Sequence, residues 1–229
     1  MATDVETRVD PRLTVGARIP FKWVTLFVII GAVLPFFLEG YATFQGTLIM
    51  IYAIAILGLN LLTGFNGQFS LGHSAFYAVG AYTAAILVYH LDWPVYVTIP
   101  FGGIVCFIAG FLFGLPALRL EGLYLALATF ALGVSVPQIL KSSHLEGLTG
   151  GVQGLDIFRP KVPAFLSENF GITMDQWWYM IAFVTMLFMF WIAWNLINSR
   201  TGRAMMAIRD NPIAARSMGV NASLYKSLT

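Results

Sequence analysis

The chain has 229 residues, of which 58% are hydrophobic and 10% are charged, and its mean hydropathy is +0.77. Soluble globular domains carry roughly 25% charged residues, and a water-soluble core could not hide this much apolar surface. The formal net charge of +2 gives no electrostatic basis for binding nucleic acid, and a single cysteine excludes an internal disulfide framework and a cysteine-rich metal site. The composition therefore predicts an integral membrane protein that has the lipid bilayer as its solvent.

A polar N-terminal tail, residues 1–22, precedes six apolar stretches whose lengths approach the roughly 20 residues of a transmembrane helix. None of the six contains Asp, Glu, Lys or Arg, each of which costs about 2.5–3.5 kcal/mol at the centre of a membrane helix. No signal-peptide cleavage site follows the first stretch, so we interpret it as a retained membrane anchor. The sequence thus predicts an all-α, polytopic helical bundle of about six transmembrane helices between residues 23 and 197. The expected spans are residues 23–38, 44–62, 74–91, 95–118, 123–140 and 177–197.

The basic residues predict the orientation of this bundle. If the N-terminus lies in the cytoplasm and six crossings alternate sides, ten of the thirteen Lys and Arg residues lie on the cytoplasmic side. Only Lys141, Arg159 and Lys161 then lie outside. Because loops rich in Lys and Arg stay in the cytoplasm, we expect a cytoplasmic N-terminus.

A glycine-rich, uncharged segment separates the second and third spans. It is too polar to cross lipid as a regular helix, and irregular backbone near a bilayer survives only against protein or a water-filled cavity. We predict a broken helix that lines the path of a zwitterionic solute, because helix ends that point into a cavity can hold such a solute. The alternative, in which small residues only let helices pack, stays open. The candidate path residues are Thr63, Gly64, Asn66, Gly67, Gln68, Ser70, Gly72 and His73.

For His73 we favour packing or hydrogen bonding at the inner membrane interface over proton relay or metal binding. His90 and His144 have no partners at metal-ligand spacing, so no metal site is expected. On the outer side, residues 141–176 form a long connection, and such connections are usually functional or disordered. Within this external loop Thr149, Gly150, Gly151 and Gly154 are expected to shape a gate or to meet an external binding protein, with a plain flexible turn as the open alternative.

The segment after the last span, residues 198–221, is basic and carries helix-capping signals. Asn211 can cap a helix that begins at Pro212, where the missing N–H costs nothing. Gly219 suits the left-handed position just past the end of that helix. We predict a loop with a stiff helix of about two turns, with Ala214 and Ala215 as a flat side that another surface can approach. An ordinary basic juxtamembrane loop is the alternative.

The spacing of Ala214, Ala215 and Gly219 resembles the Glu-Ala-Ala-x-x-x-Gly signature of ABC importer permeases, with Ile213 in place of the Glu. The longer block, which adds Gly202-Arg203-Ala204 and Asn211-Pro212, resembles the form found in branched-chain amino acid ABC transporter permeases of the LivM type. Three further segments resemble the same family, and the matches run in order from about residue 50 to 221. These segments are residues 59–82, 119–126 and 148–151.

This resemblance implies a type I-like ABC importer of the bacterial plasma (inner) membrane. In such an importer two homologous permease subunits enclose a path, two cytoplasmic ATPase subunits drive it, and a periplasmic or extracellular solute-binding protein delivers the solute. The resemblance makes the segment after the last span a coupling helix that seats in an ATPase groove. The departure at Ile213 means that contacts are not transferred to that position. The residues implied in coupling are Gly202, Arg203, Arg209, Asn211, Pro212, Ala214, Ala215 and Gly219.

The resemblance implies leucine, isoleucine and valine as solutes, with urea, short amides and aromatic acids as alternatives within the family. The chain has no phosphate-binding loop, so ATP and Mg²⁺ are expected on partner subunits, with no cofactor in this chain and no enzymatic role. An ATP-independent channel or secondary transporter is the alternative of another class. Residues 222–229 look like the start of a further, truncated element near Leu224, so a non-transporting fragment is also an alternative.

Overall fold

The computed structural model describes residues 21–117, 120, 122–157, 162, 171–222 and 224–225. Over these residues the regular elements are all helices, as the composition and the uncharged spans predicted. Five helices are long and apolar enough to cross a membrane. These are α2 (Gly40–Asn60) with the π turn η3 (Leu61–Phe65), α3 (His73–Leu91), α4 (Val95–Ala117), α5 (Leu123–Leu140) and α8 (Met174–Asn198).

The expected first span, residues 23–38, is shorter than predicted. Helix α1 (Phe21–Val33) gives way to a 3₁₀ turn, η2 (Leu34–Phe36). At about 1.5 Å per residue its apolar part is about 22 Å long, less than the hydrocarbon thickness of about 30 Å. Pro35 is the physical reason, since it has no N–H to donate to the carbonyl of Gly31. That carbonyl instead accepts a hydrogen bond from the Tyr179 hydroxyl at 3.1 Å. The described residues therefore hold five full spans and one short apolar helix.

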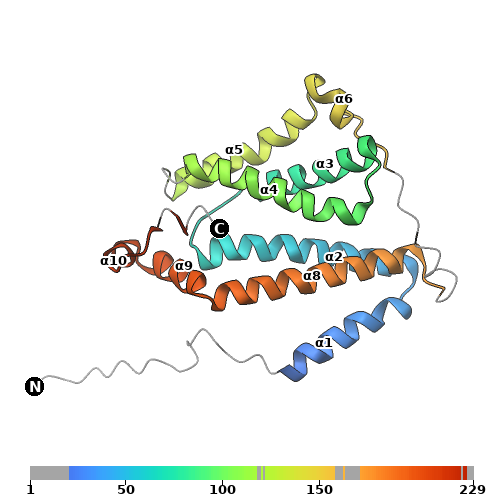
Figure 1. Ribbon diagram of the computed structural model, residues 1–229, viewed down its shortest axis with the longest axis horizontal. Coiled ribbons are helices and arrows are strands. Elements are labelled where there is room, and N and C mark those ends of the chain that lie inside the picture. The colour runs from blue at the N-terminus through green and yellow to red at the C-terminus, as the bar shows by residue number, and fades with distance from the viewer. Residues whose placement is uncertain are drawn as a thin grey trace, which may run out of the picture.

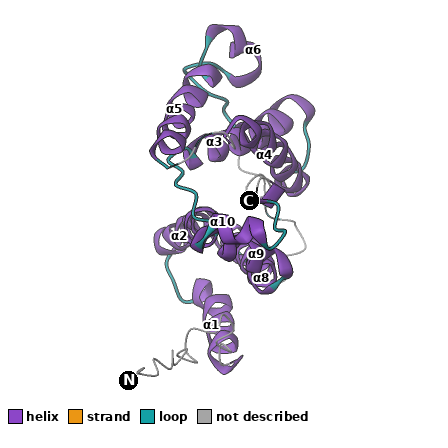
Figure 2. Ribbon diagram, turned by 90° about the vertical axis from the view of Figure 1, so that its left-hand side faces the viewer, coloured by secondary structure: helices purple, strands orange, loops and turns teal. Residues whose placement is uncertain are grey.

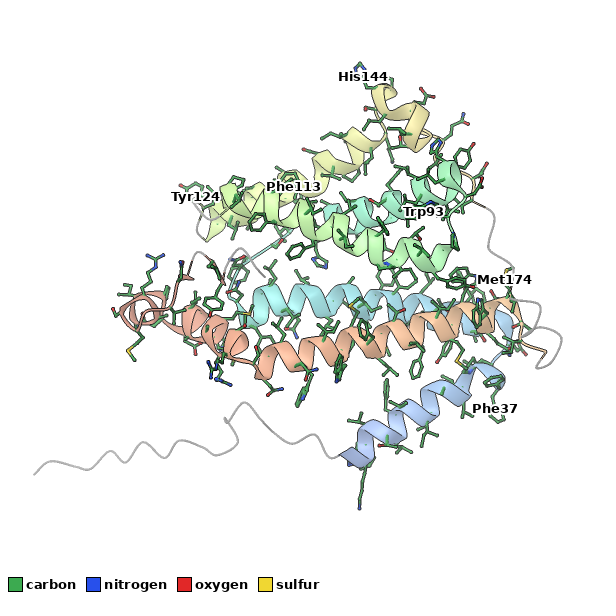
Figure 3. All side chains as sticks on the ribbon, viewed as in Figure 1. Phe37, Trp93, Phe113, Tyr124, His144 and Met174 are labelled. Atoms are coloured by element: carbon green, nitrogen blue, oxygen red, sulfur yellow. The ribbon has the colours of Figure 1, made fainter. Side chains whose placement is uncertain are left out.

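The long helices alternate in direction along one axis of the molecule (Figure 1). Their connections therefore lie at two opposite ends. Figure 3 shows Phe37, Trp93 and Met174 at one end, and Tyr124 at the other. The end near Tyr124 also carries α9 and α10 and is called the α9 end, and the opposite end is called the α6 end. The bounds are α6 (Glu146–Thr149), with the preceding 3₁₀ turn η4 (Ser143–Leu145), α9 (Arg200–Asp210) and α10 (Pro212–Ser217).

The helices form two groups, which Figure 2 shows one above the other. In one group α2 packs on α8 around a core of Met50, Tyr179, Ala182, Phe183 and Met186. Glycines bring the backbones together, because small residues let membrane helices approach closely. A Cβ at Gly46 would lie 2.9 Å from the Tyr179 ring, and helix α1 packs its Gly31 against the ring of Phe183.

In the other group α3 packs between α4 and α5. A Cβ at Gly80 would lie 3.0 Å from the sulfur of Cys106, and the Cys106 thiol donates to the Phe76 carbonyl at 3.3 Å. On the other side of α3, a Cβ at Gly133 would lie 3.1 Å from the Ser74 hydroxyl. Close backbone approach thus holds this second group together.

Large apolar side chains point outward along the spans. Ile49, Ile56 and Val184 are 68%, 64% and 64% exposed, although each lies within a full-length span. In water such a surface would be strongly unfavourable, whereas lipid tails are as apolar as these side chains. The exposed helix faces therefore fit a bilayer, and the chain is an all-α integral membrane protein.

Replacing Gly46 with alanine should lower the midpoint of thermal unfolding in lipid nanodiscs. The added Cβ meets the Tyr179 ring, which is 1% exposed and held by its hydroxyl, so it cannot move aside. Overpacking of this kind costs about 1–3 kcal/mol. Gly103→Ala is the matched control, because a Cβ there meets nothing within 4 Å. Equal shifts for the two variants would contradict the described packing of α2 on α8.

Candidate functional site

A cavity of about 340 Å³ lies between the two helix groups, toward the α9 end. This first cavity has apolar walls and a few uncharged polar side chains, and no Asp, Glu, Lys or Arg is among the described residues that line it. Its size falls in the range of about 300–1,000 Å³ that is usual for small-molecule sites. The lining residues are Gly58, Leu61, Leu62, Gln68, Ser70, His73, Phe76, Cys106, Phe107, Gly110, Phe111, Phe113, Gly114, Leu125, Thr129, Leu132 and Leu196.

A second cavity, of about 530 Å³, lies between α4 and α8. Its walls are almost wholly apolar, and it lies nearer the α6 end than the first cavity does. Phe107 lines both cavities. The two cavities together therefore lie along a large part of α4, on either side of Phe107. The other lining residues of the second cavity are Ile99, Pro100, Gly103, Ile104, Val184, Thr185, Phe188 and Met189.

Of the eight predicted path residues, the structure places Gln68, Ser70 and His73 in the wall of the first cavity. The His73 ring hydrogen-bonds the backbone of Ala55, and a Cβ at Gly58 would lie 3.2 Å from its Cε1. The absence of a side chain at Gly58 thus makes room for the imidazole between α2 and α3. Packing, hydrogen bonding and lining the cavity are combined in this one side chain.

The remaining predicted path residues do not line the cavity. The Thr63 hydroxyl donates to the Leu59 carbonyl at 2.7 Å, within its own helix. Gly72 packs against the backbone carbonyl of Thr129 so closely that a Cβ would not fit. The Thr129 hydroxyl accepts from the backbone N–H of Leu71 at 3.0 Å. The end of the glycine-rich segment is therefore attached to α5, and Thr129, which the sequence did not indicate, both anchors it and lines the cavity.

Helix α9 was not predicted, because its basic residues suggested a loop around the short helix. The Ser199 hydroxyl caps it by accepting from the Gly202 N–H at 3.3 Å. Gly202 has no room for a Cβ against the carbonyls at the end of α8. Met205 and Ile208 are each 2% exposed and lie on its buried face. The helix is amphipathic, and that periodicity was the signal the sequence offered.

Helix α10 forms as the sequence predicted. The Asn211 side-chain oxygen accepts from the N–H groups of Ile213 and Ala214, at 3.1 and 3.0 Å. Pro212 is the first residue of the helix, and Gly219 has φ +82° beyond its end. The prediction of a flat side formed by both alanines is wrong. Successive residues point about 100° apart around a helix, so two neighbouring alanines do not face the same surface.

Of the two alanines expected to form that flat side, only Ala214 is exposed. Ala215 is 5% exposed and packs with Ile208 and Ala222. The exposed large apolar side chains of this region are Ile213 and Met218, at 78% and 84%. A partner surface would therefore meet those two residues and Ala214, and not Ala215.

The two predicted sets of residues meet at Arg209. Its Nη1 donates to the Gly64 carbonyl at 2.6 Å. Gly67, at φ +69°, lies so close that a Cβ would be 2.8 Å from Arg209 Cγ. Between these glycines Asn66 is 2% exposed, and its side-chain nitrogen and oxygen have no hydrogen-bond partner among the described residues. An unsatisfied buried amide costs about 1–3 kcal/mol.

The predicted external-loop residues form a compact turn at the α6 end. The Thr149 hydroxyl donates to the carbonyls of Leu140 and Leu145, at 2.7 and 2.9 Å. Gly150, Gly151 and Gly154 have φ of +71°, +58° and +78°. The described part of the loop is thus a hydrogen-bonded turn built on left-handed glycines. The stretch from 158 to 170, except residue 162, lies outside the described residues, as do residues 1–20, Arg119 and residues 226–229.

Comparison with known proteins agrees with this architecture. The family model described as branched-chain amino acid transport system / permease component matches residues 42–229. The chain belongs to this permease family. No solved structure matches the chain significantly.

Two curated relatives carry the name high-affinity branched-chain amino acid transport system permease protein LivM. The protein from Salmonella typhimurium is 32% identical over 219 residues, which cover 87% of this chain and 51% of the relative. The protein from Escherichia coli is 32% identical over 224 residues, which cover 89% of this chain and 52% of the relative. The chain spans about half the length of these curated relatives.

Replacing Gly150 with alanine should loosen the compact turn at the α6 end. A left-handed backbone costs a residue with a Cβ about 1–2 kcal/mol, and this Cβ would also meet the Gly154 carbonyl. Amide hydrogen exchange of Gly154, whose N–H donates to the Gly150 carbonyl at 3.1 Å, should become faster in bicelles. Gly147→Ala, in the short helix α6 that precedes the turn, is the control, since a Cβ there meets nothing within 4 Å. Unchanged protection of the Gly154 amide in the Gly150 variant would contradict the described geometry of the turn.

Proposed function

We propose that this chain forms part of the membrane-spanning permease subunit of an ABC importer and translocates branched-chain amino acids. The observation that carries the proposal is the uncharged first cavity between the two helix groups of a chain that belongs to a permease family. In this proposal the chain has no enzymatic role, and ATP and Mg²⁺ bind to separate ATPase subunits.

The chemistry of the first cavity fits an amino acid with an aliphatic side chain. Its apolar walls include Leu61, Leu132 and Leu196, which suit the side chain of leucine, isoleucine or valine. Gln68, Ser70 and Thr129 offer uncharged hydrogen-bonding groups for the ammonium and carboxylate groups. Helix α3 begins at His73 in the cavity wall, and the positive end of a helix dipole favours a carboxylate. Such a site can hold a zwitterion without a charged partner.

The α9 end supplies the surface for the ATPases in this proposal. The N-terminus, α9 and α10 lie in the cytoplasm of a bacterium, as the distribution of Lys and Arg favours. The exposed apolar side chains of Ile213 and Met218, beside the exposed Arg216, present a small surface that a groove can receive. A movement of the ATPases on this surface would switch the permease between two conformations.

Further partners complete the proposed importer. The outward apolar faces of the spans would meet lipid and a homologous permease subunit, which closes the second cavity. At the α6 end the exposed Leu148 and Val152, at 52% and 82%, lie on the compact outer turn, where a solute-binding protein would dock. Urea, short amides and aromatic acids remain the alternative solutes that the test below separates from leucine.

The solute should protect Cys106 from alkylation. Cys106 is the only cysteine of the chain and lines the first cavity, so the natural protein can be labelled without a new cysteine. In membranes that hold the complex, leucine at about ten times its Kd should slow labelling by N-ethylmaleimide about tenfold, because only the empty cavity reacts. Valine should act like leucine, whereas urea and phenylalanine should not.

Two controls separate occupation of the cavity from a general change of the protein. Cys106→Ser should abolish labelling of this chain. In that background, Phe37→Cys, which is 82% exposed at the α6 end and lies outside the proposed docking turn, should be labelled at the same rate with and without leucine. Protection by urea alone would contradict the assignment of amino acids as solutes. A rate of Cys106 labelling that no solute changes would contradict the proposal that the first cavity is the solute path.

A further inference from the structure

The contact between α9 and the glycine-rich segment gives Arg209 a role beyond docking an ATPase. We propose that Arg209 is a positioning residue that fastens residues 64–72, called here the cavity segment, to the α9–α10 pair. A displacement of α10 is thereby passed to the wall of the first cavity. This inference rests on the proposed function, because it is this residue that would connect the ATPase surface to the solute.

The geometry of the contact is specific to an arginine facing two glycines. Arg209 Nη1 donates to the Gly64 carbonyl at 2.6 Å, while the aliphatic stem of the same side chain lies against Gly67. The carboxylate of Asp210 accepts from Arg209 Nε at 3.0 Å, which directs the guanidinium. One side chain therefore holds the backbone of the segment by a charge-assisted hydrogen bond and by packing, and the arginine stem leaves no room for a side chain at Gly67.

The parts on both sides of this contact are themselves well connected. Ile208, the neighbour of Arg209, is buried with Ala215 of α10, so α9 and α10 form one packed unit. Downstream of the contact, Gln68 and Ser70 line the first cavity. The segment then ends on α5, where the Leu71 N–H donates to Thr129 at 3.0 Å. A shift of α9 must consequently move the polar side of the cavity relative to α5.

Neighbouring polar side chains do not provide the same attachment. Arg203 lies on the same helix, but its Nη1 donates to the Asn198 carbonyl at 3.0 Å, at the junction of α8 and α9. Asn66 lies within the cavity segment and is buried, yet its amide makes no hydrogen bond within the described residues. The attachment at this point therefore depends on Arg209.

A reporter cysteine in the cavity segment tests the attachment itself. Ser70→Cys in the Cys106→Ser background places the only thiol of the chain on the segment, in membranes that contain the complex. Adding Arg209→Ala should speed its alkylation about fivefold, since a hydrogen bond from a charged group is lost and the segment is released. Arg209→Lys, which keeps the charge and much of the stem, should give a smaller increase. Arg200→Ala, which removes an exposed guanidinium from the start of the same helix, should leave the rate unchanged.

A cross-link tests whether the attachment transmits movement. An ideal Cβ at Gly67 lies 3.3 Å from Arg209 Cβ, close to the roughly 3.8 Å between the Cβ atoms of a disulfide. In the Cys106→Ser background, the pair Gly67→Cys and Arg209→Cys should therefore cross-link under mild oxidation. The reduced pair, like Arg209→Ala, should hydrolyse ATP with little solute uptake. Oxidation should restore uptake per ATP, because the covalent bond replaces the lost contact.

The outcomes separate this inference from the proposed function. Uptake by the unaltered complex with no effect of Arg209→Ala on labelling or on uptake per ATP would overturn the role of Arg209 and leave the transport function standing. Faster labelling in a complex that takes up no solute would support the attachment and contradict the proposed function. A cysteine pair that does not cross-link, or a cross-link that fails to restore uptake, would contradict the proposal that this contact passes movement of α10 to the wall of the first cavity.

Discussion

The structure depends on one constraint, which is that hydrocarbon and not water surrounds the long helices. Without water, every backbone N–H and C=O of a span must be satisfied within the protein, and helices achieve this by themselves. Side chains then have no hydrophobic reason to turn inward, so Ile49, Ile56 and Val184 stay exposed. Helices are drawn together instead by close packing, which explains why glycines lie at the contacts of α1, α2 and α3 with their neighbours.

The same constraint explains where irregular backbone is found. Pro35 frees the Gly31 carbonyl, and the Tyr179 hydroxyl satisfies it from α8. The glycine-rich segment leaves the helical pattern, and Thr129 accepts from the Leu71 N–H on one side while Arg209 donates to the Gly64 carbonyl on the other. At both breaks, side chains from other helices thus supply partners for backbone groups. At the second of these places the break also lines the first cavity, where the proposed solute site lies.

Sequence was sufficient for features that depend on local chemistry. Five spans followed from length and from the absence of charge, and the Asn211 cap from residue types at fixed spacing. The short α1 was missed because the effect of Pro35 on a helix end cannot be judged from apolar length alone. The link between Arg209 and Gly64 joins residues 145 positions apart, and the rotation of Cys106 toward the cavity is set by packing. Neither has a local signal.

The central claim is that the chain crosses the membrane with its α9 end inside the cell and its outer turn outside. Two similarly exposed residues, Val152 at 82% and Met218 at 84%, mark the opposite ends. Each is replaced by cysteine in the Cys106→Ser background, and intact cells are treated with a membrane-impermeant thiol reagent. The account predicts that Val152→Cys is labelled at once and Met218→Cys only after permeabilisation. Labelling of Met218→Cys in intact cells would contradict it.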